Sequence, residues 1–193
     1  MKTAILLSVA TCVLFSPGCT KESSTPSASA AISHSSQVAQ HFIGEHFGGG
    51  IVFYIDSTAK HGLVAYPEDF EEAGVWSYNN VITGARGTCL GAGIFNTRRI
   101  VLVQGTSDTL EDYAALEVAE FTANGYKDWY LPSKDELNEL YKQKDVVGGF
   151  KPFAYWSSSE VDASTAWFQN FASGIQVKSP KLGGYALRAI RLF

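Results

Sequence analysis

The tryptophans and carboxylates of this sequence are the side chains best suited to binding a ligand. Trp76 lies in a stretch rich in glycine and asparagine, close to Tyr78 and Asn79, and Asn96 lies near the end of that stretch. The flat face of an aromatic ring packs well on the apolar face of a sugar ring, while amide and hydroxyl groups can hydrogen bond its hydroxyls. These four residues therefore predict a ligand-binding loop.

Glu160 and Asp162 lie in a second polar stretch, Ser-Ser-Ser-Glu-Val-Asp-Ala-Ser-Thr, which runs from Ser157 to Thr165. Carboxylate oxygens are the ligands that a hard cation such as Ca²⁺ prefers. However, the Glu-Pro-Asn and Trp-Asn-Asp signatures of calcium-dependent sugar binding are absent from the sequence. We therefore predict no bound metal and treat the two carboxylates as candidate contacts to the ligand itself.

Catalytic chemistry has weaker support in the sequence. His41, Glu45 and His46 resemble a metalloprotease motif, but three residues separate the first histidine from the glutamate where the inverted zinc motif has two. Cys89 lacks a local nucleophile signature, and we expect it to be a lone, semi-buried cysteine. We therefore predict that the protein is not an enzyme and needs no cofactor.

A capped helix is the clearest structural element. Ser133 and Glu136 have the spacing of a capping box, in which each side chain bonds the backbone N–H of the other residue. Leu137, Leu140 and Tyr141 then fall on one helix face. The sequence therefore predicts an amphipathic helix that begins after Ser133 and ends before a pair of glycines.

The rest of the sequence predicts short strands and one more helix. Trp129 and Trp156 lie beside strand patterns, so we expect them in the core. We expect a helix from Ser107 or Asp108 to Asn124 and an irregular stretch over Val75–Thr97. The predicted strands are Ile51–Ile55, Leu63–Tyr66, Tyr155–Ser158, Thr165–Phe171, Ile175–Lys178 and Tyr185–Leu192. This order is typical of an α+β fold with two helices and antiparallel sheets.

Five ordered motifs resemble one bacterial family. They are Ile43–Asp56, Gly91–Thr97, Asp128–Leu140, Tyr155–Glu160 and Tyr185–Phe193. Over about residues 43–193 the chain resembles the Lcl C-terminal domain family, which is named for the end domain of a collagen-like surface adhesin. The resemblance implies a C-type-lectin-like fold, similar to formylglycine-generating-enzyme domains, in which the first and last strands pair.

The implied pairing leads to two expectations. Ile51–Ile55 should lie against Leu187–Leu192 at the end of the chain. Arg188 then lies on a strand that packs on the core, where a guanidinium is costly to bury unless it is paired. We therefore expect Arg188 to meet several carbonyls or a carboxylate, with Asp128 and Glu160 as candidates.

The N-terminal residues resemble an export signal. Residues 1–18 carry one lysine and an apolar stretch too short to span a bilayer, followed by small residues ahead of Cys19. This pattern predicts a lipoprotein signal peptide with lipidation of Cys19, and the alternative is ordinary secretory cleavage nearby. Residues 19–40 are rich in Ser, Ala and Thr, which predicts a disordered tether ahead of one domain at residues 41–193.

Charge excludes one class of partner. Without residues 1–18 the chain has 14 basic and 19 acidic residues, a net charge of −5. Nucleic-acid binding needs a basic surface, so we predict none. We expect an outer-membrane lipoprotein of the cell envelope whose domain binds a glycan or a surface protein without catalysis. The alternatives are a structural subunit of a surface assembly, as a homo-oligomer, and an enzyme on the formylglycine-generating fold.

Overall fold

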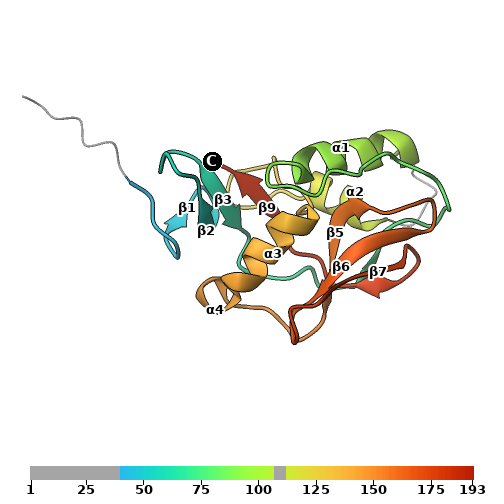
Figure 1. The fold of residues 1–193 in the computed structure, drawn as a ribbon. Helices are drawn as coiled ribbons and strands as arrows, with labels where there is room; N and C mark the ends of the chain where they lie inside the picture. Colours follow the sequence, from blue (N-terminus) through green and yellow to red (C-terminus); the bar gives the residue numbers. More distant parts are fainter. Residues whose placement is uncertain (1–39, 107–111) are drawn as a thin grey trace, which may run out of the picture. The chain divides into compact units, whose positions relative to one another are not determined.

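Antiparallel strands and four helices make up residues 40–106 and 112–193, the part of the chain that the computed structural model describes (Figure 1). The strands are β1 (His46–Phe47), β2 (Gly50–Ile55), β3 (Gly62–Ala65), β4 (Gly74–Val75), β5 (Ala154–Glu160), β6 (Thr165–Asn170), β7 (Gln176–Pro180), β8 (Gly184–Tyr185) and β9 (Ile190–Leu192). The helices are α1 (Gly93–Gln104), α2 (Ala114–Glu120), α3 (Lys134–Lys142) and α4 (Lys144–Val147). The predicted α+β class is confirmed. The signal peptide, Cys19 and all of the tether except Gln40 lie outside the described residues.

The strand β2 is buried on both faces, as its continuous apolar sequence predicts. Ile51 and Phe53 belong to one buried cluster, whereas Val52 belongs to the other. Successive side chains of a strand point to opposite faces, so β2 contributes to two cores at once. The strand β3 does the same through Leu63 on one side and Val64 on the other.

The expected pairing of the first and last strands is wrong. The larger sheet has the order β1-β2-β3-β9, so β9 pairs with β3 and not with β2. Leu63 lies opposite Leu192, and Ala65 lies opposite Ile190. The reason is that β1 and β3 already occupy the two edges of β2, so the end of the chain pairs with the far edge of β3 instead.

The C-terminal strands form a second sheet with the order β5-β6-β7, while β4 pairs with β8. The strand patterns predicted for β5, β6 and β7 are confirmed, with the last two joined by a turn at Ser173 and Gly174. The segment between β8 and β9 runs beside β5, where the N–H of Trp156 donates to the carbonyl of Ala186 at 3.1 Å. The predicted last strand is therefore interrupted between Tyr185 and Ile190.

The helix α3 matches its prediction. The Ser133 hydroxyl accepts from the N–H of Glu136 at 3.3 Å, and Oε2 of Glu136 accepts from the N–H of Ser133 at 2.7 Å. Leu137 and Leu140 are buried on the face toward β2 and β5. Figure 1 shows α3 lying between the two larger sheets, with α4 directly after it.

The sequence predicts two helices, whereas the described residues form four, and α1 and α2 depart from what the sequence predicts. The helix α1 begins at Gly93, inside the stretch expected to be irregular, and the N-cap residue Ala92 makes no side-chain cap bond. The helix α2 ends at Glu120, before the predicted stop at Asn124, and the predicted start at Ser107 or Asp108 lies outside the described residues. Within the described chain, no helix combines the length and apolar character needed to cross a bilayer.

Candidate functional site

Trp76 is part of the core, so its predicted role as a surface for a sugar is wrong. Its side chain is 1% exposed, and Nε1 donates to the carbonyl of Ser157 at 2.9 Å. The ammonium of Lys181 lies 4.5 Å from the centre of the indole ring. A ring that is enclosed on both sides in this way has no face left for a ligand.

Glu160 is also buried, and its carboxylate already has a full set of partners. Oε1 lies 2.7 Å from Nζ of Lys181 and accepts from the N–H of Thr83, while Oε2 accepts from the N–H of Gly84, each at 2.8 Å. Burial by itself would raise the pKa of Glu160, but the bonds from Lys181 and the two N–H groups outweigh it, so the pKa is lowered. Glu160 therefore holds the loop at residues 81–85 in place, and its predicted contact with a ligand is wrong.

The side chains of Asn96 and Asp162 likewise form hydrogen bonds with backbone groups. Asn96 is buried, and its side-chain amide pairs with the N–H and the carbonyl of Gly87 at 3.1 and 2.6 Å. Asp162 lies on an exposed turn, where hydrogen bonds from Ser164 and Thr165 lower its pKa to about 2. The ligand role predicted for Asn96 is wrong, and that for Asp162 stays a prediction. In the described residues, no group of three potential metal-binding side chains comes together.

The capping box of α3 also holds the loop before α1. Oε1 of Glu136 accepts from the N–H of Gly91 at 2.8 Å, and the Ser133 hydroxyl lies 2.9 Å from the carbonyl of Cys89. Burial raises the pKa of Glu136 despite these bonds. The thiol of Cys89 is exposed, contrary to the expectation that it would be semi-buried. The sequence predicts the cap but not its hydrogen bonds to the loop before α1, because that loop lies far from the cap in the sequence.

Arg188 has the kind of partner that its burial requires, but neither of the two expected carboxylates. Its guanidinium lies 2.6 Å from Oδ1 of Asp69, and Nη1 donates to three backbone carbonyls. Asp128 pairs instead with Arg191 at 2.8 Å, and Glu160 pairs with Lys181. The expectation of a buried, paired arginine is confirmed, while the predicted partners are wrong.

The segment from Asp69 to Val75 is fixed at both of its ends. Asp69 is held by Arg188 and accepts from the hydroxyl of Tyr155 at 2.6 Å. At the other end, Gly74 and Val75 form β4. The acidic residues between these anchors, Glu71 and Glu72, are exposed, and neither has an ion-pair partner in the described part of the chain. The fold therefore presents a rigid acidic strip at the surface.

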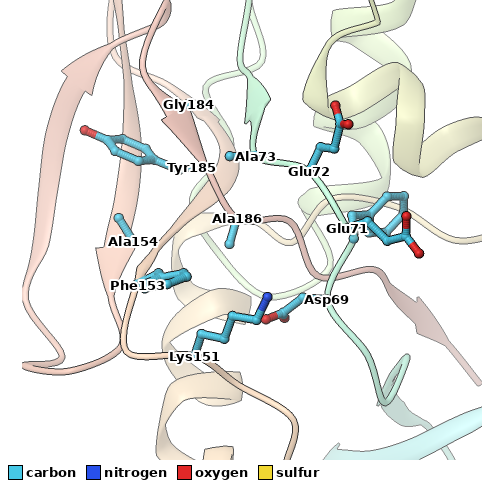
Figure 2. Close-up of a pocket in the computed structure, with 11 residues that line it drawn as sticks. Asp69, Glu71, Glu72, Ala73, Lys151, Phe153, Ala154, Gly184, Tyr185 and Ala186 are labelled. Atoms are coloured by element: carbon cyan, nitrogen blue, oxygen red, sulfur yellow. The ribbon is translucent and has the colours of Figure 1, made fainter.

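One cavity of about 210 Å³ lies on one side of this strip, and we call it the Tyr185 cavity (Figure 2). Figure 2 shows Phe153 on one side of the cavity, Glu71 on the other, and Lys151 reaching in between them. The ring of Tyr185 packs on Trp156, with 4.5 Å between the ring centres. The cavity is lined by Asp69, Phe70, Glu71, Glu72, Ala73, Lys151, Phe153, Ala154, Gly184, Tyr185 and Ala186.

A second cavity of about 570 Å³ lies on the other side of the strip, toward α2, and we call it the Glu117 cavity. Burial raises the pKa of Glu117, and the negative charges of Asp112 and Glu72 raise it further. Tyr78, a predicted ligand-binding residue, lies in this cavity. The lining residues are Phe70, Glu71, Glu72, Ala73, Gly74, Val75, Tyr78, Asp112 and Glu117.

Comparison with known proteins decides the family. The Lcl C-terminal domain family matches residues 69–191, which include all four helices, the strands from β4 to β8 and all but the last residue of β9. This chain belongs to that family. The match begins after β3, so it is shorter at the N-terminal end than the resemblance found in the sequence.

Two other comparisons add little to the family assignment. No curated protein matches the chain. A fimbrial protein from Bacteroides ovatus ATCC 8483 has a similar crystal structure, with 16% sequence identity and a TM-score of 0.47. The similar region covers 68% of this chain and 35% of that protein, so the chain spans about a third of its length. A similarity of this size carries no argument about fold or function.

In this Lcl C-terminal domain, the structure separates the sequence-predicted ligand residues. Tyr78 lines the Glu117 cavity and Asn79 is exposed nearby, whereas the other predicted residues lie in the core or on a separate turn. Sequence reasoning missed Lys151, Phe153 and Tyr185, which come together only through folding. The run Glu68-Asp-Phe-Glu-Glu72 was the one local signal, because consecutive acidic residues around an aromatic seldom form a buried element.

Proposed function

We propose that this protein is a non-catalytic binding domain of the cell envelope that binds a glycan in the Tyr185 cavity. The observation that carries the proposal is an exposed aromatic ring beside polar side chains. Phe153 is 55% exposed at the edge of the cavity, whereas Tyr185 forms part of the cavity wall with its ring directed away from Phe153 and Lys151 (Figure 2). An exposed aromatic beside a cavity is typical of surfaces that stack on an apolar ligand face.

The polar groups of the cavity suit the hydroxyls of a sugar. Carboxylates accept hydrogen bonds, and an ammonium donates them, so Glu71 and Lys151 can bond neighbouring hydroxyls. Tyr185 is held in position because its hydroxyl bonds Ser179 at 2.8 Å and its ring packs on Trp156. The cavity is smaller than the roughly 300–1,000 Å³ of sites for drug-sized ligands, so we expect it to take one sugar ring at the end of a chain.

The proposed location in the envelope comes from the sequence and the family. Residues 1–18 resemble a lipoprotein signal, Cys19 is the proposed lipidation site, and residues 19–40 would hold the domain away from the membrane. The family takes its name from a surface adhesin, which supports a role at the cell surface, and membership of the family supports the C-type-lectin-like fold that the resemblance implies. The structural-subunit alternative is supported by an exposed apolar helix face, described below.

A glycan array probed with residues 38–193 tests the proposed function. This fragment is the compact unit that holds every described helix and strand. We expect saturable binding that falls at least about tenfold in Phe153→Ala and in Glu71→Gln, because loss of about 1.4 kcal/mol of contact energy is a tenfold change in affinity. Ile175→Ala removes an apolar side chain of similar exposure outside both cavities and should bind normally.

Three outcomes would speak against this function. Binding that is unchanged in both cavity variants would place the glycan elsewhere and contradict the proposal. Absence of glycan binding, with one surface protein recovered by crosslinking on cells, would favour the protein-ligand alternative. Turnover of a substrate that depends on Cys89 would show an enzyme. Trp76→Ala is no test, because Trp76 is buried and its loss would disturb the core.

A further inference from the structure

The outer face of α1 carries the two most exposed large apolar side chains of the described residues. Leu102 is 74% exposed and Phe95 is 68% exposed. Residues seven apart lie on the same side of a helix, as do the residues three and four positions after Phe95, which are Arg98 and Arg99. We call these four residues the α1 face. Apolar side chains that lie together on one exposed face are a common feature of surfaces that meet another molecule.

The α1 face is basic, although the chain as a whole is acidic. The two arginines are the only charged residues of α1, whereas the full chain has a net charge of −4. Nε of Arg99 donates to the carbonyl of Thr83 at 2.8 Å, which fixes that side chain against the loop at residues 81–85. Arg98 is exposed and has no ion-pair partner in the ranges that the structure describes. The α1 face therefore favours a partner with a negative, partly apolar surface.

The Glu117 cavity of the same protein has the complementary character. Its lining contains four acidic residues and no basic one, together with the apolar surfaces of Phe70 and Val75. The raised pKa of Glu117 reflects both its burial and this crowding of negative charge, which an incoming cation would relieve. Its volume of about 570 Å³ can take several side chains of a helix.

We propose that the α1 face of one copy docks in the Glu117 cavity of a second copy. Two different surfaces meet in such a contact, so it is heterologous: one copy keeps its Glu117 cavity unused and the other keeps its α1 face unused. Repetition would link copies head to tail into a ring or an open chain. The proposal does not depend on glycan binding, because Lys151, Phe153 and Tyr185 line only the other cavity.

We expect the contact to be weak between soluble copies. A surface formed by three turns of one helix is small, and interfaces below about 1,200 Å² are typical of transient complexes. Charge complementarity contributes to it, so salt at about 1 M, where the Debye length is only about 3 Å, should weaken it.

Sedimentation velocity of residues 38–193 over a range of concentrations tests the proposal. We expect the weight-average sedimentation coefficient to rise with protein concentration, and Arg98→Glu and Leu102→Ser each to abolish the rise. Asp112→Lys should abolish it too, because this exposed residue lines only the Glu117 cavity. Lys60→Glu and Leu182→Ser change similarly exposed residues outside both surfaces and should leave the rise unchanged.

Mixing the two charge-reversed variants gives the sharpest result. Arg98→Glu has a helix face without net charge and an unchanged acidic cavity, whereas Asp112→Lys has an unchanged basic face and a less acidic cavity. Each alone should remain monomeric, and an equimolar mixture should associate again. A wild-type protein that stays monomeric at every concentration would overturn the proposal, as would association unaffected by Leu102→Ser or Asp112→Lys.

The same variants separate this proposal from the glycan function. Arg98→Glu, Leu102→Ser and Asp112→Lys should bind glycans on the array like the wild type. Conversely, Phe153→Ala should lose glycan binding and still associate. Loss of self-association in Phe153→Ala would place the contact at the Tyr185 cavity and contradict the docking described above.

Discussion

The pair formed by Glu160 and Lys181 shows how a buried charge is used to position a loop. Both side chains are almost completely buried, with 2.7 Å between Nζ and Oε1. The ammonium also donates to the carbonyl of Val81 and lies over the ring of Trp76. The loop at residues 81–85 and the segment at Lys181, which lie far apart in sequence, are thereby fixed to β5. The stretch after Trp76, whose composition predicts a binding surface, is instead held against the core by these charges.

Removal of one partner of this pair should destabilise the protein strongly. Lys181→Met leaves a buried carboxylate without its cation, and such a change typically costs about 3–5 kcal/mol. Chemical denaturation of residues 38–193 measures this loss. Lys178→Met, in β7 just before Lys181 but exposed, should cost less than about 0.5 kcal/mol. The double variant Lys181→Met/Glu160→Gln should recover part of the loss, and a loss equal to the sum of the single ones would contradict the pairing.

The lowered pKa of Glu160 predicts a dependence of stability on acid pH. The folded-state pKa lies below the ordinary value of 4.5, so the unfolded state binds more protons than the folded state in the window between the two values. The stabilisation is therefore present above pH 4.5 and is lost as the pH falls through the folded-state pKa. The difference in unfolding free energy between wild type and Glu160→Gln should shrink as the pH falls below 4.5.

At the scale of elements, α3 shows which features a sequence can reveal. Ser133 and Glu136 bond each other within one turn, so the information that starts the helix is local. The start of α1 has no such signal, because Ala92 offers no cap and the first turn has no acidic residue. Phe95 and Leu102 are apolar but exposed, so they also obscure the apolar periodicity from which a helix is predicted. Helix α1 is held by tertiary contacts of Ile100 and Asn96, which no local pattern could show.

The candidate site was less predictable than the strands for the same reason. Strand patterns for β2, β5 and β6 depend on neighbouring residues and were confirmed. The site depends on residues far apart in sequence, such as Asp69 and Arg188, whose side chains meet only in the folded chain. Trp76 was misplaced because its glycine-rich surroundings indicate an exposed loop, whereas Ser157 and Lys181 bury it from the other end of the sequence.

The cap of α3 should contribute more than an ordinary helix cap. Ser133→Ala removes the acceptor for the N–H of Glu136 and also the hydroxyl that lies near the carbonyls of Thr88 and Cys89. Loss of an N-cap costs about 0.5–2 kcal/mol, and we expect a value of about 2 kcal/mol here. Thermal and chemical unfolding measure it. Ser173→Ala, at an exposed turn, is the matched control, and an equal loss in both variants would contradict a special role for Ser133.

At the scale of the whole molecule, the last strand joins parts of the fold that lie far apart in sequence. Along one edge β9 pairs with β3, and the backbone of Ile190 exchanges two hydrogen bonds with Tyr130, at 2.8 and 3.1 Å. Arg191 adds an ion pair to Asp128 at 2.8 Å. Strand β9 therefore connects the N-terminal hairpin with the segment that leads into α3.

Truncation of the last strand tests this role. Residues 38–189 lack β9, which would expose Leu63 and Ala65 and leave the N–H and carbonyl groups of β3 without partners on that edge. A buried backbone group without a partner costs about 1–3 kcal/mol, and several such groups together match the whole stability of a domain, about 5–15 kcal/mol. We therefore expect residues 38–189 to show no cooperative unfolding transition by circular dichroism and to bind a dye for exposed apolar surface. Residues 38–192, which keep β9, should unfold cooperatively. A cooperative transition in the shorter fragment would mean that the hairpin and the helices form a stable core without the last strand.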